Sequence, residues 1–323
     1  MTEVLLRYDM RAPTFGPAST AELYASALEQ AAWADRLGLD AIHLMEHHGS
    51  EDGYNPSPLT LAAAIAGRTE QIRVDPVLVV PFYDPVRLAE DLAILDIVSG
   101  GRLSVTLIAG YVAREFAMYG RELKQRPALM AEAIRVLRAA WSGEPFDRDG
   151  HLIRVTPTPL QPGGPPITMG GSSEAAARRA ARLADAFQPT VGALWEVYRA
   201  ACEDAGREPG PRPPRTGPAF VHISEDPDRA WAQIAPHALH ENASYASWLD
   251  EAGVDAPFKS VADAEALRAS GRYRVLTPDA CIELARGVEQ FRLTPLMGGI
   301  PPDLSWESLE LFESRVLPAL DRG

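Results

Sequence analysis

The sequence predicts an α/β fold and, within that class, a (β/α)8 barrel. Strand-like and helix-like segments alternate along most of the chain, and eight strand-like segments can be counted. Some of them, such as residues 77–80, are continuously apolar, as in parallel strands that are covered on both faces. Eight strands in βα alternation suit a barrel better than an open sheet. Hydrophobic residues make up 46% of the 323 residues, so a large core can be buried.

Local signals place the helices and strands. Ser19 and Glu22 form a capping box at the start of the first helix, and Gly38 ends that helix as a left-handed cap. Asp84 and Pro85 give a later helix its N-cap and its first turn. The expected strands are residues 4–8, 40–46, 72–81, 103–109, 167–169, 185–187, 219–223 and 291–296. The expected helices are residues 19–38, 59–68, 84–99, 127–141, 173–183, 194–205, 277–287 and 306–317.

We expect a single barrel domain over residues 1–323, with insertions at the C-terminal mouth. The proline-rich residues 206–218 predict a surface connector. Residues 240–276 interrupt the alternation and predict a variable insertion or cap.

Composition excludes several classes of protein. The chain has 44 acidic and 31 basic residues, and the net charge of −13 argues against binding to nucleic acid or to an anionic membrane. Two cysteines are too few for a disulfide framework. No uncharged apolar run approaches the length of about 18 residues that a membrane span needs, and no signal peptide is visible. We therefore expect a cytoplasmic protein.

Common nucleotide and hydrolase motifs are absent: the sequence contains no GxGxxG, P-loop or GxSxG. His43, Glu46 and His47 formally match the HxxEH pattern of zinc peptidases, which requires a helix. Here the segment forms the end of a strand, and in an extended strand His43 and His47 lie more than about 12 Å apart. We therefore expect no metal site.

His47 is the candidate catalytic residue. It follows the second predicted strand, and in a barrel the residues at the carboxyl ends of strands line the active-site mouth. The alternative is a loop histidine whose hydrogen bonds are satisfied by the backbone. Both interpretations stay open on the residues alone.

A second candidate site follows the fifth predicted strand, where Gly170, Gly171, Ser172 and Ser173 open a helix. Backbone N–H groups at a helix start, together with serine hydroxyls, make a site suited to phosphate. A plain serine N-cap after a tight turn explains the same residues equally well. Arg126 precedes a helix and can supply a cation, although taken alone it is better explained as a solvated surface arginine.

A set of short motifs occurs in order along the chain. The most specific are Pro85-Val-Arg-x-Ala-Glu-Asp91 and Leu95-Asp-x-x-Ser-x-Gly-Arg102. The others are Glu46-His47-His48, Asn55-Pro56, Ala62-Ala63-Ala64, Val80-Pro81, Gly110, Glu115-Phe116, Gly120, Pro165-Pro166, Gly171-Ser172-Ser173 and Glu313-Ser314-Arg315-Val316-Leu317-Pro318. With these residues the chain resembles the luciferase-like flavin monooxygenases, the family of the bacterial luciferase subunits. The resemblance is dense over residues 1–190, whereas residues 191–276 match poorly.

The resemblance implies a TIM-type barrel that binds FMN or, in some branches, the deazaflavin coenzyme F-420 at its mouth. His47 aligns with the active-site histidine of the family. Ser172 and Ser173 align with the phosphate-binding serine region, with Gly171 beside them as a further cofactor-binding residue, and Arg126 aligns with a phosphate-contacting arginine. The flavin ring would rest on the third strand at Val77 and Leu78, where the family often has a non-proline cis peptide.

Two departures from the family pattern are visible. Ile108 replaces the reactive cysteine of the light-emitting subunits, which removes any reason to expect a luciferase. Ala109 replaces a phosphate-contacting arginine, which leaves the strength of phosphate binding open. Asp96 and Arg102 are interpreted as structural residues.

The leading hypothesis is a two-component monooxygenase that uses reduced FMN, delivered by a separate flavin reductase, and O2. His47 would position the peroxide or act as a general base, because its ordinary pKa lies near working pH. The substrate would be a small apolar organic molecule. Five aromatic residues are candidates for the substrate pocket, although each is also typical of the protein core or of a pocket rim. They are Tyr54, Phe82, Tyr111, Trp195 and Trp248.

Two alternatives stay open. A deazaflavin-dependent dehydrogenase or reductase would transfer hydride, and the acidic tail of its coenzyme would need basic residues such as the cluster of Arg114, Arg121, Lys124 and Arg126. The second alternative is a flavin-binding subunit without catalytic activity. The presence of His47 argues against this alternative. The resemblance also suggests a homodimer.

Overall fold

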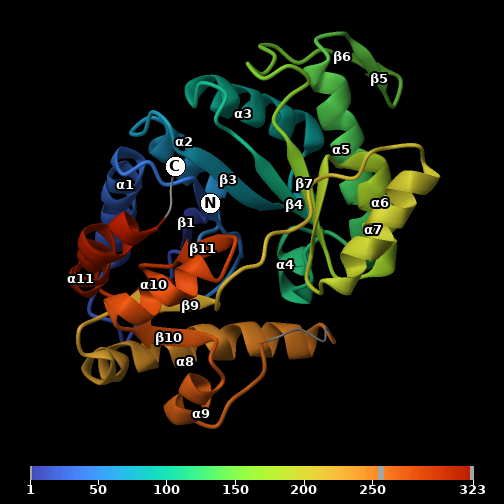
Figure 1. The fold of residues 1–323 in the computed structure, drawn as a ribbon. Helices are drawn as coiled ribbons and strands as arrows, with labels where there is room; N and C mark the ends of the chain where they lie inside the picture. Colours follow the sequence, from blue (N-terminus) through green and yellow to red (C-terminus); the bar gives the residue numbers. More distant parts are fainter. Residues whose placement is uncertain (1, 254–257, 321–323) are drawn as a thin grey trace. The chain divides into compact units, whose positions relative to one another are not determined.

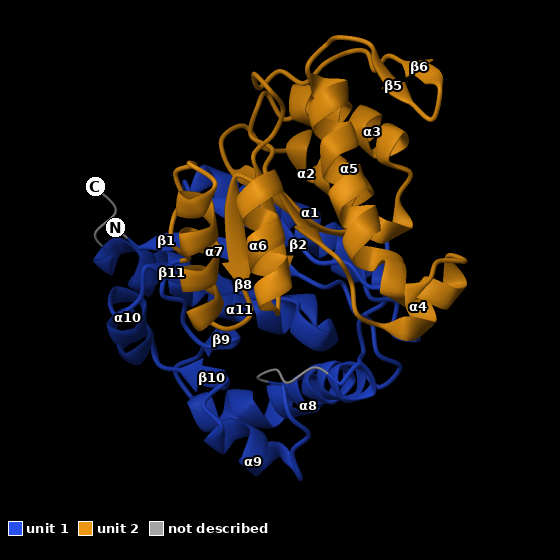
Figure 2. Cartoon of the chain, turned by 90° about the vertical axis from the view of Figure 1, so that its right-hand side faces the viewer, with its two compact units in different colours: residues 1–56, 214–323 blue, residues 57–213 orange. Residues whose placement is uncertain are grey.

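The computed structural model describes residues 2–253 and 258–320, and the chain divides into two compact units. Figure 2 shows them in different colours. Unit 1 consists of residues 1–56 and 214–323, and unit 2 consists of residues 57–213.

Unit 1 contains three adjacent parallel strands in the order β11-β1-β2 and a separate parallel pair, β9 and β10. Its strands are β1 (Glu3–Tyr8), β2 (Ala41–Leu44), β9 (Phe220–Ile223), β10 (Tyr273–Leu276) and β11 (Gln290–Leu293). Its α-helices are α1 (Thr20–Arg36), α8 (Pro227–Glu251), α9 (Ala264–Ala269), α10 (Pro278–Arg286) and α11 (Pro302–Leu311). Figure 1 shows the long helix α8 beside β10 and α9.

Unit 2 contains four adjacent parallel strands in the order β3-β4-β7-β8 and the hairpin of β5 and β6. Its strands are β3 (Arg73–Val79), β4 (Val105–Ile108), β5 (Phe146–Arg148), β6 (His151–Ile153), β7 (Ile167–Gly171) and β8 (Ala186–Pro189). Its helices are α2 (Pro58–Ala66), η1 (Val80–Phe82), α3 (Pro85–Val98), α4 (Ala113–Met118), η2 (Leu123–Gln125), α5 (Arg126–Trp141), α6 (Glu174–Leu183) and α7 (Ala193–Asp204).

The two faces of the unit 2 sheet differ in chemistry. Leu78, Leu107 and Met169 share one face by their register, and all three side chains are buried. Val77 and Thr106 lie on the other face, where Thr106 donates to Asp75 at 3.1 Å. The first face is apolar and buried, whereas the other face is mixed, because Val79 and Ile108 also lie on it.

The predicted helix signals are confirmed. Ser19 and Glu22 form the capping box of α1, and Gly38 adopts a φ of 68° after that helix. Asp84 caps α3 by accepting hydrogen bonds from the amides of Val86 and Arg87 at 2.9 and 3.0 Å. Because a capping side chain satisfies amides that have no partner in the helix, these short-range signals locate helix starts well.

Asp96 and Arg102 have the structural roles expected of them. Asp96 is fully buried and accepts two hydrogen bonds from Gln161, at 2.8 and 2.6 Å. Arg102 donates to Thr69 Oγ1 and to the carbonyl oxygens of Ile72, Ala66 and Thr69. Together these contacts tie the turn between α3 and β4 to its surroundings.

The later part of the chain differs from the sequence prediction. Helix α8 was not predicted, and residues 240–251 of the expected insertion form its second half. Strand β10 also lies inside that expected insertion and pairs with β9. Residues 254–257 of the insertion lie outside the described residues. The final helix begins at Pro302 and ends at Leu311, before a π-helical turn over Phe312–Val316. The closed eight-stranded barrel stays a prediction.

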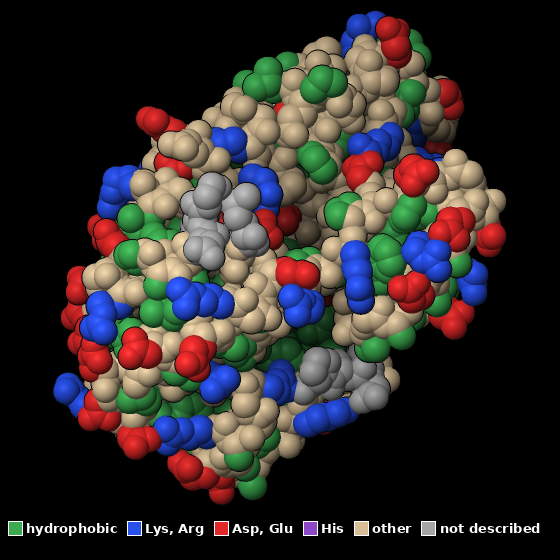
Figure 3. All heavy atoms as spheres, viewed as in Figure 1, with side chains coloured by type: hydrophobic (Ala, Val, Ile, Leu, Met, Phe, Trp, Pro, Cys, Tyr) green, Lys and Arg blue, Asp and Glu red, His purple; other side chains and the backbone are tan. Residues whose placement is uncertain are grey.

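None of the described helices combines the length and the hydropathy that a membrane span requires. On the face shown in Figure 3, basic and acidic side chains are interspersed.

Candidate functional site

A strained turn follows β1 in unit 1. Met10 is fully buried and has a φ of 61°, in the left-handed region that a non-glycine residue rarely adopts. Its neighbours Asp9 and Arg11 form a buried ion pair with 3.3 Å between Asp9 Oδ2 and Arg11 Nε. Burial raises the pKa of Asp9 to about 6, although the Arg11 charge opposes this shift. Such strain is typical of functional sites, where the surrounding contacts maintain it.

Asp52 connects this turn to the loop after β2 and to helix α8. Its carboxylate accepts hydrogen bonds from Arg11 Nη1 at 2.7 Å, His240 Nε2 at 2.7 Å, the Tyr54 amide at 3.3 Å and the Ser50 hydroxyl. Burial alone would raise the pKa of Asp52, but the hydrogen bonds from His240 and Ser50 and the charge of Arg11 hold it well below its ordinary value. Asp52 is therefore a charged anchor for three segments.

Arg11 lies among aromatic rings. Its side chain has no exposed surface, and its guanidinium carbon lies 4.6 Å from the ring centroid of Tyr54, 5.1 Å from that of Tyr245 and 5.0 Å from that of Trp248. The ring quadrupole attracts a cation over its face. Arg11 therefore stabilises a three-ring cluster, which we define as Tyr54, Tyr245 and Trp248.

His47 contacts the same cluster at the carboxyl end of β2. Its ring centroid lies 4.4 Å from that of Trp248, 4.8 Å from that of Tyr54 and 6.1 Å from that of Tyr245. The residue is 7% exposed. The neighbouring His48 pairs instead with the buried Glu46 at 2.8 Å. His47 is thus enclosed by the three aromatic rings that also surround Arg11.

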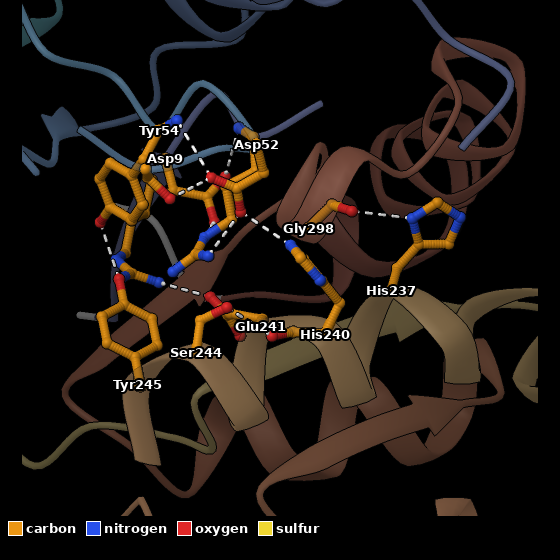
Figure 4. Close-up of polar contacts among 12 residues, drawn as sticks. Asp9, Asp52, Tyr54, His237, His240, Glu241, Ser244, Tyr245 and Gly298 are labelled. Atoms are coloured by element: carbon orange, nitrogen blue, oxygen red, sulfur yellow. Dashed lines mark hydrogen bonds and ion pairs between the residues drawn. The ribbon is translucent and has the colours of Figure 1, made fainter. Parts of the chain in front are cut away.

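Helix α8 supplies most of the remaining polar contacts, which Figure 4 shows. Tyr245 and Tyr54 join their hydroxyl groups at 2.7 Å. Glu241 accepts a hydrogen bond from Tyr273 at 2.6 Å and forms an ion pair with Arg7 at 3.5 Å. Earlier on the helix, His237 Nδ1 lies 2.8 Å from the Gly298 carbonyl oxygen. These contacts attach α8 to the strands and loops of unit 1.

The second predicted site forms the turn between β7 and α6 in unit 2. Ser172 and Ser173 are exposed, and the Ser173 hydroxyl caps α6 by accepting from the Ala176 amide at 3.2 Å. Among the described residues, no acceptor is found for the Glu174 and Ala175 amides. Two open amides and two exposed hydroxyls at a helix start can bind a phosphate.

The other predicted cofactor residues lie elsewhere in unit 2. Val77 on β3 is two strands away from the turn, about 10 Å at the usual strand spacing. Leu78 points to the helix-covered face, so only its backbone can contact a ligand on the other face. The expected non-proline cis peptide is not found on β3. Among the described residues, the cis peptide bond joins Thr156 and Pro157. Arg126 is the first residue of α5 and is half-buried.

The predicted pocket residues divide between the two units. Tyr54 and Trp248 contact His47 in unit 1. In unit 2, Phe82 stacks on Tyr119 with 4.6 Å between ring centroids. Tyr111 is half-buried after β4, and Trp195 is half-buried on α7.

Gly171 should tolerate no side chain. A Cβ there would lie 2.6 Å from the Ala176 Cβ and 3.1 Å from the Phe187 ring. We expect Gly171→Ala to lower the free energy of unfolding by about 1–3 kcal/mol through overpacking. Gly192→Ala is the matched control, because a Cβ there meets nothing within 4 Å, and it should stay within about 0.5 kcal/mol of the wild type. Thermal unfolding followed by circular dichroism compares the two, and equal melting would contradict the prediction.

Sequence reasoning missed Arg11, Asp52 and Tyr245. Arg11 and Asp52 lie in loops, where periodicity gives no information. Tyr245 belongs to α8, whose start at Asp226 and Pro227 repeats the Asp-Pro signal of α3. That signal could have revealed the helix, but not which side chains it brings to His47.

Comparisons with known proteins agree with this fold. The chain is 26% identical over 351 aligned positions to the F420-dependent glucose-6-phosphate dehydrogenase of Mycobacterium avium, covering 100% of this chain and 99% of the relative. The solved structure of monooxygenase RslO1 from Streptomyces bottropensis matches with a TM-score of 0.77 at 23% identity, over 98% of this chain and 99% of the other.

A further solved structure is the oxygenating constituent of 3,6-diketocamphane monooxygenase from Pseudomonas putida, in complex with FMN. It matches with a TM-score of 0.72 at 21% identity, over 98% of both chains. At these identities the two structural matches concern the fold alone. The luciferase-like monooxygenase family matches residues 10–288, which is most of the chain, and the chain therefore belongs to that family.

Proposed function

We propose that the protein is a flavin-dependent oxidoreductase that uses reduced FMN and O2 to oxygenate a small apolar organic substrate. The observation that carries the proposal is the start of α6, where open amides and exposed hydroxyls suit the phosphate of such a cofactor. The FMN bound to the Pseudomonas putida relative supports this choice.

The residues of the α6 start fit the cofactor's phosphate. Ser172 and Ser173 would hold it with their hydroxyls, the Glu174 and Ala175 amides would donate to it, and Arg126 would supply a positive charge. The Glu174 carboxylate forms an ion pair with Arg178, with 3.1 Å between Glu174 Oε2 and Arg178 Nη2. This pairing reduces the repulsion between Glu174 and a bound anion. Val77 would contact the ring system from β3.

Reduced FMN, when bound, supplies the electrons that activate O2 for transfer of one oxygen atom to the substrate. His47 would accept or donate a proton at a ring nitrogen, since neutral imidazole offers one donor and one acceptor. The three-ring cluster excludes water around His47, which strengthens electrostatic interactions there. A separate reductase would supply the reduced cofactor, since the sequence contains no GxGxxG motif for a nicotinamide nucleotide.

The phosphate assignment has a direct test. We expect the double variant Ser173→Ala, Arg126→Ala to weaken flavin binding about tenfold or more, because charge-assisted hydrogen bonds contribute about 1.5–3 kcal/mol each. A fluorescence titration with FMN measures the dissociation constant. The double variant Arg199→Ala, Glu196→Ala, which removes a solvent-accessible ion pair on α7, serves as control and should leave binding unchanged. An unchanged constant in the double variant would show that the phosphate binds elsewhere.

A deazaflavin-dependent dehydrogenase is the second candidate. Arg114, Arg121 and Lys124 are exposed in the segment before α5, as the acidic tail of that coenzyme requires. The Mycobacterium avium relative, which is named for this coenzyme, aligns along the whole chain. Titration with FMN, reduced FMN and the deazaflavin decides between the two candidates.

The prediction of one eight-stranded barrel domain also becomes a proposal. It is supported by the likeness to the RslO1 monooxygenase over 98% of the chain.

A further inference from the structure

The hydroxyl groups of Tyr54 and Tyr245 are 2.7 Å apart, and both side chains are buried next to His47. Arg7 also contacts this pair of hydroxyl groups. Its Nη2 group donates a hydrogen bond to the Tyr245 hydroxyl oxygen at 2.8 Å. Arg7 is held from the other side by its ion pair with Glu241. A guanidinium group cannot accept a hydrogen bond, so Arg7 is the donor and Tyr245 is the acceptor in the Arg7–Tyr245 hydrogen bond.

The direction of the Tyr54–Tyr245 hydrogen bond follows from the Arg7 contact. The Arg7 N–H group already occupies one lone pair of Tyr245 and draws electron density from its oxygen. This makes the Tyr245 O–H a stronger donor and its oxygen a weaker second acceptor, as in a cooperative chain. The Arg7 contact therefore favours donation from Tyr245 to Tyr54 over the reverse.

This direction leaves the hydroxyl proton of Tyr54 available. Within residues 2–253 and 258–320, the Tyr54 hydroxyl has no hydrogen-bond partner other than Tyr245. A buried donor without an acceptor is unfavourable, so the position favours a ligand that brings an acceptor oxygen. Burial also raises the pKa of Tyr54 well above its ordinary value, so the proton is retained at neutral pH.

We propose that Arg7 and Tyr245 orient Tyr54 so that its hydroxyl donates a hydrogen bond to an oxygen atom of the reactant bound at His47. Tyr54 is thus a catalytic residue that contacts the reactant, and Arg7 and Tyr245 are positioning residues. The reactant that presents this acceptor oxygen is O2, whose oxygen atoms gain negative charge as it is reduced and then accept a hydrogen bond more strongly. The inference rests on the proposed function, because it takes the surroundings of His47 as the place of reaction.

The first experiment reads the hydrogen-bond direction in the flavin-free protein. The nine tyrosines are labelled with ¹³C at the ring carbon that bears the hydroxyl, and Tyr54→Phe and Tyr245→Phe assign two of the signals. In mixed H₂O and D₂O, we expect the Tyr245 hydroxyl to exchange about tenfold more slowly than the Tyr54 hydroxyl, because its proton is hydrogen-bonded. Equal exchange or the opposite order would overturn the proposal. Arg7→Lys should preserve the difference, and Arg7→Met should abolish it.

The second experiment uses reduced FMN and O2. The two phenylalanine variants each remove one hydroxyl from the same buried pair and keep both rings, so they are matched. Tyr54→Phe should slow the reaction of bound reduced FMN with O2 about tenfold or more, whereas Tyr245→Phe should slow it no more than about threefold. FMN binding should be unchanged in both. Equal losses, or a greater loss in Tyr245→Phe, would contradict the proposal.

The two experiments separate the inference from the proposed function. A wild-type protein that bound neither FMN nor the deazaflavin would overturn the proposed function, and the role of Tyr54 in the reaction would fall with it. The exchange experiment needs no flavin, so it tests the direction of the Tyr54–Tyr245 hydrogen bond independently of the proposed function.

Discussion

Replacing His47 with alanine is expected to lower turnover by about 10²- to 10⁴-fold, the range for losing one acid–base group. The imidazole lies between Trp248 and Tyr54, so no solvent-exposed side chain can substitute for it. Flavin binding should remain close to wild type, because the proposed phosphate residues are in unit 2. Stopped-flow absorbance of bound reduced FMN mixed with O2, or hydride transfer if the deazaflavin binds, measures the rate.

A second variant separates chemistry from packing. His47→Phe keeps a ring against Trp248 and Tyr54 but has no nitrogen. It should unfold close to wild type and yet lose as much turnover as the alanine variant. If His47→Ala loses about 1–3 kcal/mol of stability but reacts normally per folded molecule, His47 is a structural histidine.

Replacing Asp52 with alanine is expected to cost about 3–5 kcal/mol of stability, the range for breaking a buried ion pair from one side. Arg11 would stay fully buried with only the loosely paired Asp9, and His240 would lose its acceptor. The shift in the midpoint of urea unfolding, read from tryptophan fluorescence, measures the loss. The exposed neighbour Glu51 is the control, and Glu51→Ala should change stability by less than about 0.5 kcal/mol.

The Asp52 effect should depend on pH in a defined direction. Because the pKa of Asp52 in the folded protein lies below that in the unfolded chain, its stabilisation is complete above the unfolded value of about 4. It is lost as the pH falls further. The stability difference between wild type and Asp52→Ala should therefore narrow below pH of about 4. A difference that stayed constant into acid would mean that Asp52 acts by packing rather than by charge.

The sequence predicts most of the strands and helices in the first two thirds of the chain because the signals there are local, but it misses α4 and the β5–β6 hairpin. The capping box at Ser19 and the aspartate cap at Asp84 involve residues two or three positions apart, and both appear in the structure. The apolar run in β3 likewise marks a covered parallel strand. Helix α8 escapes this reasoning because it carries an internal proline, Pro236, and many polar residues.

The site is less predictable than the fold. His47 could be chosen because a strand end is a meaningful position in a barrel. The pairing of Tyr54 with Tyr245 joins residues 191 positions apart, and the contact of Asp52 with His240 spans 188. No periodicity or local motif encodes such separations. Nor does any local pattern show that Arg11 is buried among rings, since an arginine is ordinarily exposed.

The split of unit 1 has a consequence for its biosynthesis. Residues 1–56 leave the ribosome before residues 57–213, whose synthesis takes roughly 8 to 31 s at about 5–20 residues per second. Unit 2 is contiguous and can fold during this time. His47, Arg11 and Asp52 meanwhile lack the rings and the histidine that α8 brings, so the charged groups stay hydrated. The aromatic surroundings of His47 can therefore form only after α8 has been synthesised, and the nascent chain lacks the complete proposed site until then.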